Sequence, residues 1–298
     1  MANPITNRYD FIYIFDVRNG NPNGDPDAGN APRTDPETGH GFVSDVCLKR
    51  KIRNFICLAK GAANGSPAEG YDIYVKEGSI LQGRRKEKLE LAGDSAKSIE
   101  ARRKIMCDHF FDVRMFGGVL STGTGEHMKL NCGQVRGPVQ LTFATSADPI
   151  VPLEQSVTRM AVETEREAKD QEKRQEEGAR TMGRKSIVPY ALYCAHGYIS
   201  PHFAAQTGFS EEDLGLLKQS LAMMFEHDRS AARGQMAPQV CIAFRHDSAL
   251  GNAPAHKLFE RVVVERTSPE KPPRSYADYK VTVDESNLPA GVTIERWL

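Results

Sequence analysis

Short segments rich in β-branched and aromatic residues alternate with amphipathic segments along this chain. Strand composition marks residues 8–17, 133–146, 186–199 and 238–247, and apolar residues at helical spacing mark residues 44–61 and 211–228. With two polar stretches removed, the order is strand, helix, strand, strand, helix, strand. This order predicts an α+β fold with a ferredoxin-like or RRM-like sheet that carries its helices on one face. Further strands are expected at residues 257–267 and in the segment YKVTVD.

Two polar stretches interrupt this pattern. Residues 61–104 contain glycines and then many charges, which indicates an insertion with one or two surface helices. Residues 158–185 hold eight basic and seven acidic residues and few large apolar ones. Such a segment cannot pack as a core element, so we expect it to project from the body or to be partly disordered. The 298 residues are long enough to bury a sizeable core, and we expect one domain with two insertions.

The charge balance excludes some classes of function. Lys and Arg number 39, as do Asp and Glu, so the net charge of +0 excludes a uniformly basic, histone-like binder. Residues 44–104 nevertheless hold 14 basic and 8 acidic residues, a net of +6, so a nucleic-acid site should be a local patch. No apolar run approaches the roughly 20 residues that a membrane span needs, and residues 1–10 lack a signal-peptide pattern. We therefore expect a soluble, cytoplasmic protein.

The six cysteines are scattered and predict no metal centre. None belongs to a Cys-x-x-Cys pair, so we expect reduced thiols that act as small, mostly buried hydrophobic groups. Cys194 and His196 come nearest to a metal site. Two ligands are too few for tetrahedral zinc, and we predict neither a metal nor a cofactor.

The polar loop NGNPNGDPDAGN follows the first expected strand. It presents four oxygen-bearing side chains, those of Asn21, Asn23, Asp25 and Asp27. Gly29 and Pro36 stand where an EF-hand loop needs oxygen ligands, which makes calcium binding unlikely on chemical grounds. Two interpretations stay open: consecutive turns, or a loop that meets a ligand at the edge of the sheet.

The glycine-rich segment FGGVLSTGTGEH fails both nucleotide-binding patterns. Thr124 stands where the P-loop requires Lys, and Met128 stands where a dinucleotide fingerprint requires its third Gly. The overlapping RMFGGV segment matches part of the RRM signature, but Ser121 replaces the aromatic residue at its end. A loop that approaches a nucleic-acid backbone and a simple turn both remain possible interpretations.

Residues 44–61 combine a helix signal with aligned cations. Ser44 is a plausible N-cap residue, and Lys49, Arg53 and Lys60 lie at about 100°, 140° and 120° around the helix from Leu48, with Arg50 at about 200°. Cations aligned in this way suit a sugar-phosphate backbone. The alternative is a solvated face with salt-bridge partners, for which the helix itself supplies only Asp45.

Four segments together resemble a known family. They are NPNGDP after the first strand, LKRKIRN on the first helix with Ser44 before it, DVRMFG before the glycine loop, and EHDRSAARGQM after the second helix. This combination resembles the backbone subunit of type I-C CRISPR Cascade complexes, a member of the RAMP superfamily. The likeness covers nearly the whole chain.

The resemblance implies a hand-shaped protein. Residues 1–60, 105–157 and 187–298 would form an RRM-like palm, residues 61–104 a finger insertion, and residues 158–186 a thumb insertion. Copies of such a subunit would assemble into a helical filament along the spacer of a CRISPR RNA, with the guide bases free to pair with target DNA. The implied partners also include a capping RNA-processing subunit and a large subunit, and no membrane.

The resemblance also implies which residues bind the RNA. Lys49, Arg50 and Arg53 would hold phosphates, Asn21 and Asn23 would approach from the first loop, Gly117 and Gly118 would allow close passage of the backbone, and Met182, Arg184 and Lys185 would act from the thumb. No catalytic residue is implied, and no sequence-specific reading of the RNA is expected because the aromatic residues of an ordinary RRM are not matched.

Two other functions are compatible with the sequence. Related subunits suggest a metal-dependent endoribonuclease that would use Asp25 or Asp27 of the first loop, although no paired His or Lys acid is apparent nearby. A monomeric, generic single-strand binder is the other, and it leaves the charged residues 158–185 without a purpose.

Overall fold

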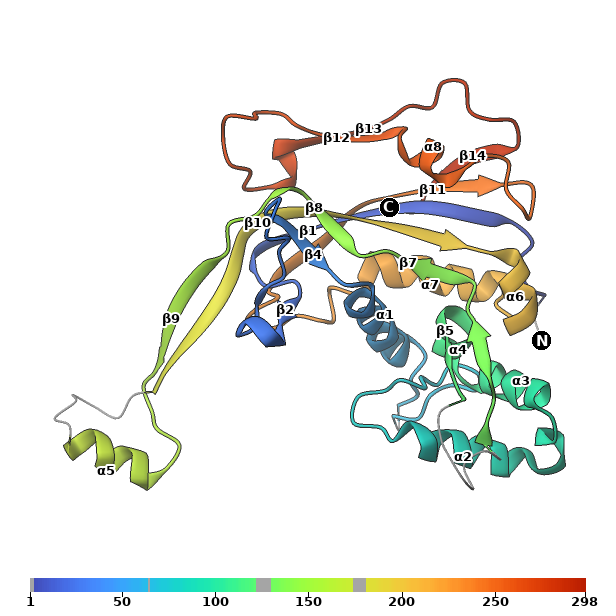
Figure 1. Ribbon diagram of the computed structural model, residues 1–298, viewed down its shortest axis with the longest axis horizontal. Helices are drawn as coiled ribbons and strands as arrows, with labels where there is room; N and C mark the ends of the chain where they lie inside the picture. The colour runs from blue at the N-terminus through green and yellow to red at the C-terminus, as the bar shows by residue number, and fades with distance from the viewer. Residues whose placement is uncertain (1–2, 64, 122–129, 174–180) are drawn as a thin grey trace.

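A single antiparallel sheet organises the molecule (Figure 1). The computed structural model describes residues 3–63, 65–121, 130–173 and 181–298. Its three long strands are β1 (Arg8–Gly20), β10 (Thr181–Ile199) and β11 (Gln235–His246), with β1 in the middle. The full order is β14-β11-β1-β10-β8-β4, and β7 and β9 also pair with β10. A mixed α/β fold with a mainly antiparallel sheet is therefore confirmed.

The remaining elements are shorter. The strands are β2 (Gly24–Asp25), β3 (Ala31–Pro32), β4 (His40–Val43), β5 (Gly117–Val119), β6 (Gln134–Arg136), β7 (Val139–Leu141), β8 (Ala144–Pro149), β9 (Leu153–Arg159), β12 (Val262–Arg266), β13 (Tyr279–Val283) and β14 (Val292–Arg296). The helices are α1 (Asp45–Ala59), α2 (Leu81–Ala92), α3 (Ile99–His109), α4 (Phe111–Phe116), α5 (Glu165–Lys173), α6 (Pro201–Thr207), α7 (Glu211–Met223) and α8 (Ala255–Phe259), with 3-10 turns at Pro26–Ala28, Gly93–Ala96 and Tyr276–Asp278. None of these helices is both long and apolar enough to span a membrane.

The two helices expected from apolar spacing cover one face of the sheet. Alternate residues of β1 point to this face, and Phe11, Tyr13 and Phe15 are fully buried there. Leu48 and Ile52 of α1 belong to the same core cluster, as do the four leucines of α7. The Tyr13 hydroxyl donates a hydrogen bond of 2.8 Å to the carbonyl oxygen of Leu221 in α7, which satisfies its polar group inside the core.

The opposite face of the sheet is covered by the C-terminal part of the chain. Ile12 and Ile14 of β1 pack there against β12 and β13, and Phe244 of β11 packs against α8. Figure 1 shows α1 and α7 on one side of the sheet and β12, β13 and α8 on the other. Helices on one face alone were expected, and α8 departs from that expectation. Because Tyr190, Phe244 and Tyr279 are buried on this face, their rings are not available to stack with bases.

A second, smaller core lies beside the sheet. Helices α2, α3 and α4 gather there with β5 and β6, as Figure 1 shows. Their buried cluster includes Leu89, Met106, Phe110, Cys132 and Val135. The surface helices expected within residues 61–104 are therefore α2 and the start of α3, and they share this core with a helix, α4, that the sequence analysis did not predict.

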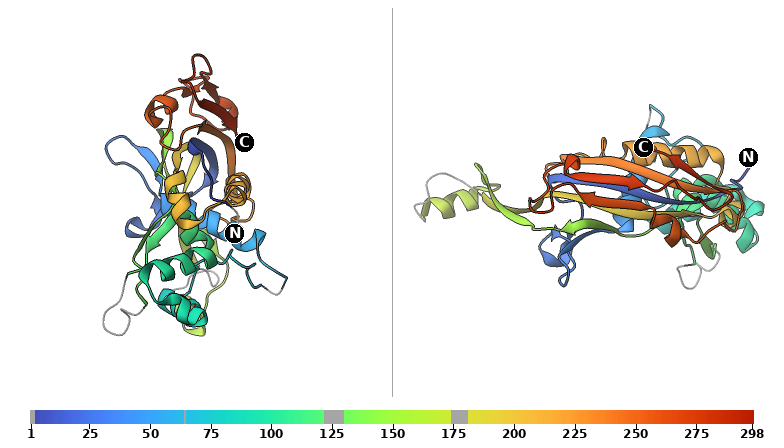
Figure 2. Two further views of the ribbon diagram at one scale, coloured as in Figure 1. Left: turned by 90° about the vertical axis from the view of Figure 1, so that its right-hand side faces the viewer. Right: turned by 90° about the horizontal axis from the view of Figure 1, so that it is seen from above.

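Strands β9 and β10 leave the body as a two-stranded extension, defined here as residues 153–159 and 181–187 with α5 between them. The strands pair from Leu153 opposite Ile187 to Arg159 opposite Thr181. Figure 1 and the right-hand view of Figure 2 show the extension projecting beyond the sheet. The expectation that residues 158–185 project is met by their described part, but β10 begins at Thr181 rather than at residue 186. The expected glycine loop lies partly at residues 122–129, outside the described residues.

Two strand predictions were wrong in detail, and one strand of the main sheet was missed. The strand expected at residues 133–146 is broken into β6, β7 and the start of β8, because Pro138 has no N–H for a ladder and Gly137 lies against the backbone of Phe116. The strand expected at residues 257–267 begins as helix α8 and becomes β12 only at Val262. Strand β14 was not predicted, although it forms the edge of the sheet.

Candidate nucleic-acid interface

The loop after β1 is tied to the start of α1. The Ser44 backbone N–H and hydroxyl each donate a hydrogen bond of 2.9 Å to Asn23 Oδ1, and Ser44 Oγ accepts from the backbone N–H of Cys47 as the helix cap. Asn21 is 6% exposed and donates through Nδ2 to the carbonyl oxygen of Asn30 at 2.7 Å. Both Asn side chains thus fix the loop, and a direct contact of either with RNA stays a prediction.

The cations of α1 have partners within the chain. Lys49 Nζ lies 2.8 Å from Asp45, Arg53 Nε lies 2.7 Å from Asp112 of α4, and one Arg50 guanidinium nitrogen donates to the carbonyl oxygen of Val75 at 2.7 Å. The sequence analysis identified Asp45 as the partner inside the helix, and the structure adds Asp112, which lies 59 residues from Arg53 in the chain and pairs with it from another helix. Within the chain, these cations therefore have the ion-pair and hydrogen-bond partners that the alternative interpretation of the helix face predicted.

Asp112 is the centre of this arrangement. It is 1% exposed, and besides Arg53 it accepts the backbone N–H of Tyr74 at 2.7 Å and of Val75 at 3.1 Å. A buried carboxylate needs such donors to offset the loss of water. Asp112 therefore orients Arg53 and joins α1, α4 and the segment before α2.

Phe116 links the α1 cations to the predicted glycines. The Lys49 ammonium lies 5.5 Å and the Arg53 guanidinium 5.1 Å from the centre of its ring, within the range of a cation–π contact. Gly117 follows directly with φ of 74°, and a Cβ there would stand 2.3 Å from the Val135 carbonyl oxygen, so only glycine fits. Lys49, Arg53 and Gly117 are thus brought together through one ring.

Gly117 and Gly118 line a surface pocket of about 430 Å³. Its walls come from α4, β5, β6 and α6, and they include the side chains of Arg136, Gln140 and Phe203. No acidic side chain is among the residues that line it. The sequence analysis did not assign Arg136 or Phe203, because each stands alone in the sequence and becomes a neighbour of the glycines only through the fold.

Met182, Arg184 and Lys185 lie on the extension and not beside α1 (Figure 1). Met182 is 75% exposed, and Arg184 forms an exposed ion pair of 3.2 Å with Glu154 across the ribbon. Side chains alternate along a strand, so Met182 and Arg184 share one face and Lys185 points to the other. The structure therefore separates the predicted site into two groups, one on the body and one on the extension.

The other candidate ligands have structural contacts. Asp25 accepts the backbone N–H of Asp27 at 3.2 Å and lies 3.6 Å from the Arg33 guanidinium. On β10, burial lowers the pKa of His196 and raises the pKa of Cys194 to about 11. The described residues contain no group of three or more His, Cys, Asp or Glu side chains placed to hold a metal ion.

Comparisons with known proteins agree with one another. The family model described as CRISPR-associated protein Cas7 matches residues 7–284. A curated Haloferax volcanii protein, "CRISPR-associated protein Cas7", is 25% identical over 265 residues, which cover 83% of this chain and 72% of that protein.

Two solved structures show a more distant likeness. A chain of a "CRISPR RNA-guided surveillance complex, pre-nicking" has a TM-score of 0.46 and 14% identity over 80% of this chain and 78% of its own. A chain of a "CRISPR RNA-guided surveillance complex" has a TM-score of 0.43 and 13% identity over 80% and 68% of the two chains. TM-scores below 0.5 at this identity support no conclusion about this protein. The family model, in contrast, spans nearly the whole chain, and the protein belongs to the Cas7 family of CRISPR-associated proteins.

Proposed function

We propose that this protein is the RNA-binding backbone subunit of a type I-C CRISPR Cascade complex and not an enzyme. The observation that carries the RNA-binding role is the surface where Lys49 and Arg53 meet the Gly117–Gly118 edge through Phe116. Family membership supplies the CRISPR context. The proposed ligand is the sugar-phosphate backbone of a CRISPR RNA, held without reading its sequence.

The α1 cations retain donors for this role. Arg53 spends its Nε on Asp112, and no hydrogen bond in the described residues uses its two terminal nitrogens. Lys49 has three N–H donors and gives one to Asp45. Each cation is held in a fixed orientation by its acid, so less side-chain entropy is lost when it binds a phosphate. The same pairing reduces the net charge that the RNA meets at this surface.

The covered sheet supports binding without sequence readout. An ordinary RRM stacks bases on aromatic residues of its open sheet face. Here Tyr190 and Phe244 of that face belong to clusters packed under β12, β13 and α8. Phosphate contacts position a strand and carry no sequence information, which suits a subunit that must accept any spacer.

The hand-shaped organisation is part of the proposal. The sheet and its helices would be an RRM-like palm, residues 61–104 the fingers and the β9–β10 extension the thumb. In this structure the extension starts at Leu153, so the thumb would begin five residues before the expected residue 158. A two-stranded ribbon is marginally stable in water by itself, which favours a partner surface for it.

Assembly follows from the distance between the two groups of site residues. The extension that carries Met182, Arg184 and Lys185 projects away from α1 of its own chain (Figure 1). They would therefore contact the RNA held by a neighbouring copy. Repetition of one heterologous contact generates an open helical filament along the RNA. The filament would act in the cytoplasm, pair its guide with target DNA, and meet a capping RNA-processing subunit and a large subunit.

Native mass spectrometry of the full chain with unstructured single-stranded RNAs tests this function. The RNAs increase in length by steps and have two unrelated sequences. We expect subunits to add one at a time at a constant length increment that is the same for both sequences. A protein that stays monomeric contradicts the assembly role, and RNA returned shortened supports the endoribonuclease alternative through Asp25 or Asp27.

A further inference from the structure

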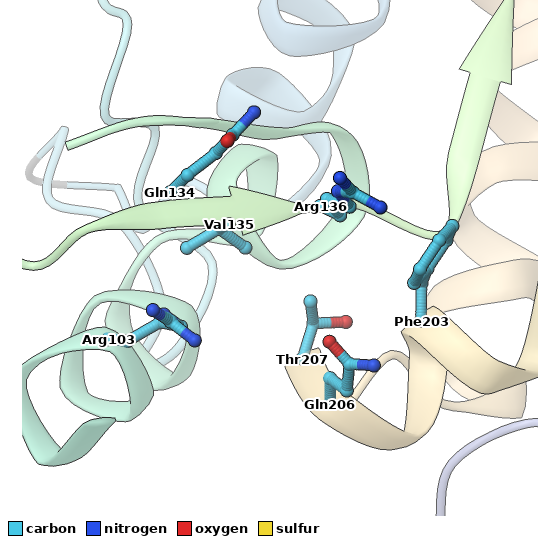
Figure 3. Close-up of a pocket in the computed structure, with 7 residues that line it drawn as sticks. All are labelled: Arg103, Gln134, Val135, Arg136, Phe203, Gln206 and Thr207. Carbon is cyan, nitrogen blue, oxygen red and sulfur yellow. The ribbon is translucent and has the colours of Figure 1, made fainter. Parts of the chain in front are cut away.

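A second pocket lies where α3, β6 and α6 meet (Figure 3). Its volume is about 280 Å³, near the lower end of the roughly 300–1,000 Å³ that is typical of small-ligand sites. Its polar and aromatic lining consists of Arg103, Gln134, Arg136, Phe203, Gln206 and Thr207. Figure 3 shows Thr207 and Gln206 on α6, with Arg103 on one side and Arg136 and Phe203 on the other.

The pocket is positively charged. The guanidinium groups of Arg103 and Arg136 form no ion pair or hydrogen bond with any described residue, and no acidic side chain lines the pocket. Glu100 lies one turn from Arg103 on α3, and its pKa is lowered mainly by hydrogen bonds with its own backbone N–H and with Ser98, with a smaller contribution from the Arg103 guanidinium, with which it makes no ion pair in the described residues. Two cations without acids at one cavity favour an anionic ligand. Guanidinium groups match the oxygens of a phosphate in particular.

Thr207 supplies an independent sign of a ligand. Its side chain is 4% exposed, lines the pocket, and carries a hydroxyl without a hydrogen-bond partner in the described residues. A buried hydroxyl left unpaired lowers stability, so such groups are rare unless something else pairs with them. A ligand oxygen in the pocket would accept this hydrogen bond.

The second pocket adjoins the glycine-lined one, because the two share part of their lining. Both are lined by Gln134, Val135, Arg136 and Phe203. A chain that passes over Gly117 and Gly118 therefore reaches the second pocket without leaving the surface. Phe203 stands between the two pockets, where its ring can stack with a base.

We propose that this second pocket binds a phosphate group of a nucleotide. Arg103 and Arg136 flank the phosphate, Thr207 donates a hydrogen bond to it, and Phe203 stacks with the attached base. The phosphate belongs either to a nucleic-acid strand that continues from the glycine edge or to a free nucleotide. The strand source rests on the proposed function, whereas the phosphate site itself does not.

Three probes and four variants test the site in the full chain. The probes are inorganic phosphate and uridine 5′-monophosphate, followed by phosphorus NMR, and a labelled uridine hexanucleotide, followed by fluorescence anisotropy. The variants are Arg103→Gln, Arg136→Gln and Thr207→Val, with Arg296→Gln as the control. Arg296 is an exposed arginine on β14 whose pair with Glu285 lies outside both pockets.

We expect Arg103→Gln and Arg136→Gln each to weaken binding at least about tenfold, the loss typical of one charge-assisted hydrogen bond. Thr207→Val should also weaken binding, yet leave the unfolding temperature unchanged or higher because it removes an unpaired buried hydroxyl. Arg296→Gln should bind as the unaltered protein does. Equal affinity in all four variants, or no binding of any probe by the unaltered protein, overturns the proposal.

The comparison of probes separates the two sources. Much tighter binding of the hexanucleotide than of the mononucleotide assigns the site to a strand, and equal binding assigns it to a free nucleotide. The outcome is distinguishable from that of the proposed function. If the three pocket variants assemble stepwise on RNA and bind the probes as the unaltered protein does, the phosphate site is contradicted and the backbone role is not. If the protein binds phosphate but never assembles on RNA, the backbone role is contradicted and the phosphate site is not.

Discussion

Cations of the same type stand in opposite settings on α1 and on the β9–β10 extension. Arg53 has 11% of its side chain exposed and is paired with an acid that is 1% exposed, whereas Arg184 has 78% exposed and its partner Glu154 has 57%. On the body, positive charge joins helices and is partly neutralised. On the extension, it makes few contacts within the chain. The burial of a cation, and not its charge, therefore decides whether it stabilises the fold or stays available to a partner.

The largest effect should come from removing the acid that holds Arg53. Asp112→Ala leaves a buried guanidinium and two backbone N–H groups without their acceptor, so we expect a loss of about 3 kcal/mol in the free energy of unfolding. Denaturant unfolding measures this. The matched change on the extension, Glu154→Ala, should be nearly neutral because its ion pair is exposed. Similar losses of unfolding free energy in the two variants would contradict this difference between α1 and the extension.

The half-buried carboxyl of Asp16 on β1 shows the effect of burial through the pH dependence of stability. Burial raises the pKa of Asp16 above its usual 3.8, so the folded protein binds this proton more tightly than the unfolded chain does. Its contribution to stability is present below pH 3.8 and is lost as the pH rises through the folded pKa. Asp16→Asn should therefore increase stability at neutral pH, and the difference should vanish in acid.

Asp35 gives the control of opposite sign. Hydrogen bonds from the Thr38 hydroxyl and the Glu37 N–H lower the pKa of Asp35. Its stabilising contribution is therefore present above pH 3.8 and is lost as the pH falls. Asp35→Asn should lower stability at neutral pH in the same urea titrations. Asp16→Asn and Asp35→Asn changing stability in the same direction would contradict the assignment of burial as the cause at Asp16.

The salt dependence of RNA affinity should differ between the two sets of cations. Removing two cations that each neutralise a phosphate of a single strand lowers the slope of log affinity against log salt by about 1.4. We expect Arg184→Ala with Lys185→Ala to approach that value in an assembled complex. Lys49→Ala with Arg53→Ala should weaken binding equally for unrelated RNA sequences but change the slope less, because both cations belong to largely buried ion pairs, whereas the Arg184–Glu154 pair is exposed. Filter binding at several salt concentrations measures both slopes.

The smallest effect is on the stability of the free chain. Arg184→Gln with Lys185→Gln should change the free energy of unfolding by less than about 0.5 kcal/mol, as exposed substitutions usually do. Thermal unfolding without RNA checks this. A clear loss would mean that the extension packs within its own chain and is not free for a neighbour.

Helical spacing and strand composition in the sequence predicted the elements α1, α7 and β1. Ser44 caps α1, and Leu48, Ile52 and Phe55 form its buried face because helical spacing places them together. β1 and α7 follow from composition and spacing in the same way. Predictions failed where one residue changes the backbone, as Pro138 does within the expected strand at residues 133–146.

Most of the candidate site could not be predicted from spacing. The Arg53–Asp112 pair joins residues 59 positions apart, and Asp112 could be recognised as a partner only after α4 was known. The neighbours of the glycine edge, Arg136 and Phe203, come from two further elements. The β9–β10 extension has polar strands without an alternating apolar pattern, since both of its faces are exposed, so periodicity could not reveal it.

The central claim is that the extension of one copy acts at the α1 surface of the next. Native mass spectrometry can test it with two folded variants, one carrying Lys49→Ala and Arg53→Ala, the other Met182→Ala, Arg184→Ala and Lys185→Ala, on an RNA that accommodates two copies. Each variant alone spoils the contact between copies, but a mixed pair retains one intact contact. We predict that mixing restores two-copy complexes that contain one of each variant. Complexes that form equally well from either variant alone, or a mixture that restores none, would contradict the claim.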